Sequence, residues 1–76
     1  MDYKKKILNK WAIGEKIRLE MLKNNLTYEE LAFILELTSP RVIYDWVNGK
    51  KLPKLENYIN ICNLFNVKME DFIVFL

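Results

Sequence analysis

The stretch Leu26–Pro53, LTYEELAFILELTSPRVIYDWVNGKKLP, predicts two short helices joined by a turn. Thr27 is a good helix N-cap, and Glu29 and Glu30 follow where the positive end of the helix dipole favours negative charge. Apolar residues then recur at helical spacing, which predicts a first helix over about 28–35.

A second cap signal follows at Ser39, with Pro40 directly after it. Proline suits the first position of a helix, because its missing N–H would have no partner there. Asn48 and Gly49 are expected to end this helix, since glycine tolerates the left-handed geometry of a helix C-terminus. The second helix should therefore cover about 40–48, with three apolar side chains facing inward: Val42, Ile43 and Trp46.

A helix ahead of this pair is predicted to end at Asn24. Its start is open between Asp2 and Asn9. Three residues near the N-terminus recur at four-residue intervals, as on one face of a helix: Tyr3, Ile7 and Trp11. This spacing favours the early start, with a helical extension over about 2–12.

Two further helices are predicted after Pro53. Apolar residues recur there at intervals of three and four: Leu55, Tyr58, Ile59, Cys62 and Phe65. Asn66 is expected to end this fourth helix, and a short fifth helix should take about Met69–Phe75. The expected fold is all-α, a compact five-helix single domain over 1–76.

The composition is that of an ordinary soluble domain, with 51% hydrophobic and 29% charged residues among 76. No apolar run approaches the roughly 20 residues of a membrane span, and the start lacks the apolar core of a signal peptide. The single cysteine excludes an internal disulfide and fits the reducing cytoplasm.

The residue types that most catalytic and metal sites require are scarce. There is no histidine, so a Ser/His or Cys/His nucleophilic arrangement is impossible, and a zinc site normally needs more thiolates or imidazoles than one. We therefore expect no enzyme, no metal and no cofactor, and no small-molecule ligand is evident.

The formal net charge of +2 is unevenly distributed. Residues 1–23 hold seven Lys/Arg against three acids, residues 24–54 four against four, and residues 55–76 one against three. The positive excess therefore lies near the N-terminus. Since attraction to phosphates scales with the number neutralised, a monomer should bind DNA weakly.

The chain resembles the Cro/C1-type (XRE) helix-turn-helix family of bacterial and phage DNA-binding regulators. The resemblance runs from about Ile13 to Phe72, and its carriers are Ile13-Gly14, Ile17-Arg18, Leu26-Thr27, Glu30-Leu31-Ala32, Ile43, Trp46, Gly49, Pro53, Phe65 and Val67. It implies a lambda-repressor-like domain with its motif at about 27–48. The implied function is sequence-specific double-stranded DNA binding by a transcriptional regulator, repressor-like and dimeric, in the cytoplasm and on the nucleoid when bound.

The resemblance also implies which side chains meet DNA. The base-reading positions would be Ser39, Pro40, Arg41, Tyr44 and Asp45, because the N-terminal part of the second motif helix meets base edges. Phosphate contacts would come from Thr27, Tyr28, Asn48, Lys50, Lys51 and Lys54. Arg41 is the best candidate for reading a base, since a guanidinium can form a bidentate pair with guanine.

Near these residues the chain departs from the family pattern in two places. Tyr28 stands where the family more often has glutamine, and the chain has one extra residue, which we place in the turn at 36–39.

The C-terminal end is strongly apolar and is expected to form a homodimer interface: Phe72, Ile73, Val74, Phe75 and Leu76. The same feature, with the near-neutral motif region, keeps an alternative open. This is a protein-interaction module on the same fold, such as an antitoxin or a partner-binding regulator.

Overall fold

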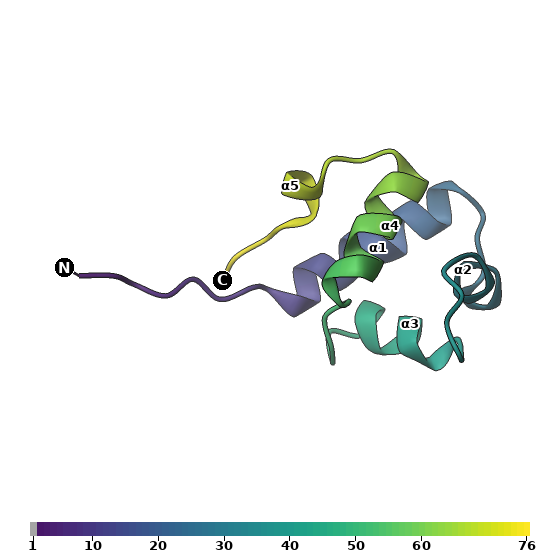
Figure 1. Cartoon of the computed structure of the whole chain (residues 1–76), viewed down its shortest axis with the longest axis horizontal. Coiled ribbons are helices and arrows are strands. Elements are labelled where there is room, and N and C mark those ends of the chain that lie inside the picture. The colour runs from purple at the N-terminus through teal and green to yellow at the C-terminus, as the bar shows by residue number, and fades with distance from the viewer. Residues whose placement is uncertain (1) are drawn as a thin grey trace.

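A computed structural model describes residues 2–76, and it confirms the all-α fold with five helices (Figure 1). The helices are α1 (Lys10–Lys23), α2 (Tyr28–Ile34), α3 (Arg41–Val47), α4 (Leu55–Phe65) and α5 (Met69–Phe72). Over residues 2–76 no helix has the length and apolar character that a membrane crossing requires.

The core is formed by one apolar face from each helix. Its fully buried side chains are Ile13, Ile17, Leu31, Ile43 and Ile61. Burying an aliphatic side chain of this size contributes about 1.5–3 kcal/mol, so these residues hold the short motif helices in place. Trp46 and Cys62 are buried among them, at 3% exposure each.

The helices α1 and α3 make their closest approach at Gly14. A Cβ at this position would overlap the backbone oxygen of Trp46 and press on the Cα of Val47. The absent side chain therefore lets the backbone of α1 lie directly against the end of α3.

Four helix ends share one pattern of hydrogen bonds, with a residue in the left-handed region just after the helix: Asn25, Glu36, Gly49 and Asn66. After α3, the N–H of Gly49 donates to the carbonyl of Trp46 at 3.1 Å, and the N–H of Lys50 donates to that of Asp45 at 2.9 Å. This is the Schellman arrangement, which satisfies carbonyls that the helix leaves unpaired. The predicted stop at Gly49 is thus confirmed.

The predicted cap of α2 is confirmed in full. The hydroxyl of Thr27 accepts from the N–H of Glu30 at 3.1 Å, and the carboxylate of Glu30 accepts from the N–H of Thr27 at 3.0 Å. These reciprocal bonds form a capping box, which fixes the position where α2 begins.

The start of α3 differs by one residue from the prediction. Pro40 occupies the cap position with φ −61° and ψ −19°, and α3 proper begins at Arg41. Ser39 still supports this end, because its hydroxyl accepts from the N–H of Arg41 at 3.1 Å. Because the dihedral angles of Pro40 are already helical, the predicted and observed starts of α3 differ by only one residue.

The predicted helical extension over 2–12 is wrong for its first part, since α1 begins at Lys10. Asn9 is the cap, and its side chain accepts from the N–H of Ala12 at 3.1 Å. The chain before it pairs with the C-terminus instead. The N–H of Asn9 donates to the carbonyl of Val74 at 2.7 Å, and the N–H of Leu76 donates to that of Ile7 at 2.8 Å.

The fifth helix is also shorter than predicted, because it ends at Phe72 and Ile73 is extended. The pairing of Leu8 with Phe75 in an antiparallel bridge takes the following residues out of helical geometry. Phe72 is 4% exposed, and its ring meets Tyr58 edge-on at 6.4 Å. Phe72 therefore belongs to the core, and its assignment to the dimer interface is wrong.

Candidate nucleic-acid interface

The outward face of α3 carries a shallow hollow of about 430 Å³, lined by Arg41, Tyr44, Asp45, Asn48 and Lys50. We call it the α3 hollow. Three of these residues were predicted to read bases and two to bind phosphate. The opposite face of α3 is buried in the core through Ile43 and Trp46. Core packing therefore holds α3 in place, with the α3 hollow on its exposed face.

Ser39 and Pro40 lie at the start of α3 and are half-buried. The Ser39 oxygen already accepts from the backbone N–H of Arg41, so the hydroxyl has its proton and one lone pair left for other partners. Neither residue lines the α3 hollow. The structure thus keeps them beside the hollow and separates them from the other three predicted reading residues.

Tyr28 and Tyr44 form an aromatic pair that joins the start of α2 to the outer face of α3. Their ring centroids are 4.8 Å apart, and the planes are inclined by 57°. Sequence reasoning assigned one ring to a phosphate and the other to a base, and it missed the contact between them. No spacing rule reveals it, because the pair spans the turn between two helices.

Thr27 is occupied by the capping box. Its N–H donates to Glu30, and its hydroxyl oxygen accepts from the backbone. The hydrogen bonds from the backbone and side chain of Thr27 lower the pKa of Glu30, which remains a carboxylate beside this helix start. A phosphate here would meet that negative charge, so Thr27 offers a weaker contact than the resemblance implies.

The two lysines after α3 are exposed and lie directly past its C-terminus. The N–H groups of Lys50 and Lys51 both donate to the carbonyl of Asp45, at 2.9 and 3.3 Å. These bonds fix the backbone of the turn and leave both ammonium groups on flexible stems. The backbone of Lys50 and Lys51 is thus fixed at the end of α3, and Lys50 lines the α3 hollow.

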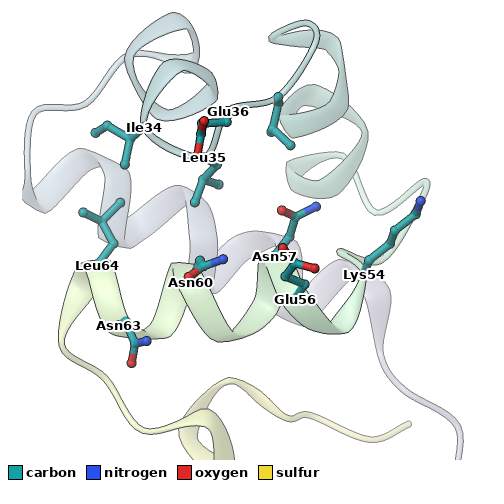
Figure 2. A pocket seen from close by; sticks show the side chains of 10 residues that line it. Ile34, Leu35, Glu36, Lys54, Glu56, Asn57, Asn60, Asn63 and Leu64 are labelled. Atoms are coloured by element: carbon teal, nitrogen blue, oxygen red, sulfur yellow. The ribbon is translucent and has the colours of Figure 1, made fainter.

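Lys54 lies apart from that group, on the edge of a second hollow of about 720 Å³. Figure 2 shows this hollow between the end of α2 and α4, with Ile34 and Leu35 pointing toward Asn60 and Leu64. Ile34 and Leu64 are 45% and 38% exposed, so it is an open groove. Size alone does not mark the site, because the residues suited to DNA contact gather on α3.

The α3 hollow combines the donors that nucleic acids require. Arg41 and Lys50 are cationic, Asn48 offers an amide and Tyr44 a phenol, against the single carboxylate of Asp45.

Cys62 lies in the core, away from the α3 hollow, and burial raises the pKa of its thiol. This thiol therefore packs as a small hydrophobic group.

Comparison with known proteins identifies the family of this fold. A helix-turn-helix family model matches residues 16–72. No curated protein matches the chain significantly. Among solved structures, the restriction-modification controller protein C.AhdI from Aeromonas hydrophila is 18% identical to this chain. The alignment covers 82% of this chain and 92% of that chain, with a TM-score of 0.71.

Two other solved structures are similar in fold. The clp gene regulator ClgR from Corynebacterium glutamicum is 23% identical, with 86% of this chain and 68% of that chain covered and a TM-score of 0.75. The SOS-response transcriptional repressor LexA from Eubacterium rectale is 23% identical, with 87% and 69% covered and a TM-score of 0.79. At these identities the structures support the fold, and the match over residues 16–72 shows that the chain belongs to the Cro/C1-type helix-turn-helix family.

Proposed function

We propose that this protein is a DNA-binding transcriptional regulator that reads the major groove with α3. The observation that carries the proposal is the gathering of Arg41, Tyr44, Asp45, Asn48 and Lys50 on one exposed face of a helix whose other face is buried. An α-helix fits the major groove of duplex DNA, where each base pair presents a distinct pattern of donors and acceptors.

The proposed roles follow from the chemistry of each group. Arg41 donates to O6 and N7 of a guanine, and Asp45 accepts from a cytosine amino group one turn further along α3. Tyr44 contacts a thymine methyl with the exposed part of its ring, while Tyr28 supports that ring from α2. Lys50 and Lys51 neutralise phosphates beside the groove and fix the register of the protein on the duplex.

Assembly as a homodimer is part of the proposal. Ile73, Phe75 and Leu76 are 39%, 46% and 73% exposed, and an apolar groove of about 420 Å³ lies beside them. A contiguous apolar surface of this kind usually marks an interface. Two copies joined there would present two α3 helices, which meet successive major grooves when they are about 34 Å apart. The site would then be pseudo-palindromic, and binding at a promoter would act as repression.

The proposed regulator has no enzymatic activity. It acts in the cytoplasm, and on the nucleoid when it is bound to DNA.

The competing candidate is a protein-interaction module on the same fold. The exposed Phe33, at 85%, and the apolar C-terminal residues favour that candidate, because either surface could bind a protein partner.

Salt-dependent binding separates the two functions. A fluorescent 30-base-pair duplex of mixed sequence is titrated with the protein between 25 and 300 mM salt, and binding is followed by anisotropy. A regulator of duplex DNA should show log K falling linearly with log salt, by about 0.9 for each phosphate neutralised. Absence of binding at the lowest salt would contradict the proposal and favour the protein-interaction module.

A further inference from the structure

The net positive charge of this protein lies in five residues. The whole chain holds 12 Lys/Arg and 10 Asp/Glu, for a net charge of +2. Residues 2–6, Asp-Tyr-Lys-Lys-Lys, hold three of the lysines and one of the acids, and so carry a net +2 themselves. Residues 7–76 therefore hold nine positive and nine negative groups, which sum to zero. The folded body therefore has no net charge.

These five residues, which we call the arm, are exposed and extend away from the helices (Figure 1). Their base is held by the antiparallel pairing of residues 7–9 with 74–76. The ammonium of Lys6 also lies 5.2 Å from the ring centroid of Phe75. The C-terminal residues thus fix the point and the direction in which the arm leaves the body.

The start of α1, a few residues after the arm, contacts the turn that follows α3. The Trp11 side chain, at the start of α1, packs on Gly49, where an added Cβ would overlap its ring. Gly49 immediately precedes Lys50 and Lys51 in the turn after α3. Figure 1 shows the arm leaving the body at the end where this turn lies. The arm therefore leaves the body at the end of the molecule where the turn with Lys50 and Lys51 lies.

We propose that the arm binds the phosphate backbone of duplex DNA next to the site that α3 reads. Five extended residues reach about 16 Å, which along the DNA axis corresponds to four or five base-pair steps of about 3.4 Å each. Lys4, Lys5 and Lys6 can then neutralise up to three phosphates. The arm supplies the net positive charge that the body lacks, and this inference rests on the function proposed above.

A flexible basic segment attracts any polyanion, including an anionic membrane. Duplex DNA is favoured here by position, since the arm leaves the body at the same end as the cationic turn after α3. A membrane-binding segment would need no such neighbourhood, and it would gain from apolar residues between its lysines. The lysines of the arm instead follow one another without interruption.

The test compares two charge-matched triple variants of the full chain. The first is Lys4→Gln, Lys5→Gln and Lys6→Gln. The control is Lys16→Gln, Lys23→Gln and Lys68→Gln, which lowers the net charge by the same three units on α1 and before α5. Helical circular dichroism and melting temperature establish that both are folded. Binding to the mixed-sequence 30-base-pair duplex is then measured over the same salt range as for the wild type.

The arm variant should lose about 2–3 in the slope of log K against log salt, at about 0.9 per phosphate, and at least about tenfold in affinity at 50 mM salt. The control should keep a slope within about 0.5 of the wild type. Equal slopes in the wild type and the arm variant would overturn the inference while leaving DNA binding by the body intact. Equal losses in both variants would overturn it too, because net charge alone would then explain the effect.

Two further outcomes concern the partner. A wild-type protein that does not bind the duplex at all would remove the proposed function, and the role of the arm with it. Wild-type binding to phosphatidylserine vesicles at higher affinity than to the duplex, lost in the arm variant, would assign the arm to a membrane surface and overturn the proposal.

Discussion

On α3, neighbouring residues have opposite environments. Ile43 is 0% exposed, whereas Tyr44, the next residue, is 52% exposed. This alternation was predictable, because apolar residues at helical spacing define the inner face and leave the rest outside. The Tyr28–Tyr44 pair was not, since a contact between side chains on two helices depends on how those helices pack.

The first residue-scale prediction distinguishes reading from attraction. Arg41→Ala should reduce affinity for a preferred site by about 1–3 kcal/mol and relax the base preference at one position, because a bidentate pair with a base is lost. Lys51→Ala should weaken binding to all duplexes alike. Anisotropy titrations on preferred and scrambled duplexes measure both. If Arg41→Ala lost equal affinity on the two duplexes, Arg41 would not be a reading residue.

The second residue-scale prediction concerns Tyr58. Its hydroxyl is buried and has no hydrogen-bond partner among the described residues. Burial, with a smaller contribution from Cys62, raises the pKa of this phenol to about 12. An unpaired buried polar group costs about 1–3 kcal/mol, so Tyr58→Phe should stabilise the fold at pH 7, as measured by urea denaturation.

The pH dependence provides an internal check on Tyr58. In the unfolded chain the phenol titrates near pH 10, so between about pH 10 and 12 unfolding releases a proton. The free energy of unfolding should therefore fall over this interval as pH rises, and the Phe variant should lack this part of the decline. A less stable Tyr58→Phe protein at pH 7 would show that the hydroxyl does have a partner.

At the scale of helices, local signals predicted most of the structure. The capping box at Thr27, the stop at Gly49 and the apolar spacing of α4 all act within a few residues, and the observed helices follow them. The predicted start of α1 and the predicted end of α5 were both wrong, and for the same reason. Residues 7–9 pair with residues 74–76, and no local pattern encodes a contact between the two ends of the chain.

The element-scale prediction tests the contact between α1 and α3. Gly14→Ala should destabilise the protein by about 2 kcal/mol or more, because the new methyl group would overlap backbone atoms of Trp46 and Val47. Alanine favours a helix over glycine by about 1 kcal/mol, so propensity alone predicts the opposite sign. Urea denaturation gives the difference, with Lys16→Ala as the control on the same helix. A more stable Gly14→Ala protein would mean that the helices lie further apart.

At the scale of the whole molecule, the apolar C-terminal surface predicts self-association. Ile73→Glu should shift the protein toward the monomer, because a carboxylate at a buried interface lacks a partner. Sedimentation equilibrium measures the shift, and Leu22→Glu on α1, also exposed, provides the control. A wild-type protein that stays monomeric at high concentration, both free and on DNA, would rule out the dimer.

The central claim is that α3 reads base sequence in duplex DNA, and selection from a random duplex library tests it most directly. The wild-type protein, mixed with 30-base-pair duplexes randomised over their central 20 positions, should enrich a preferred sequence over several rounds. We expect two related half-sites about one helical turn apart, with a guanine contacted by Arg41 that loses its enrichment in Arg41→Ala. A bound pool that stays random, although the protein binds duplex DNA, would contradict the account.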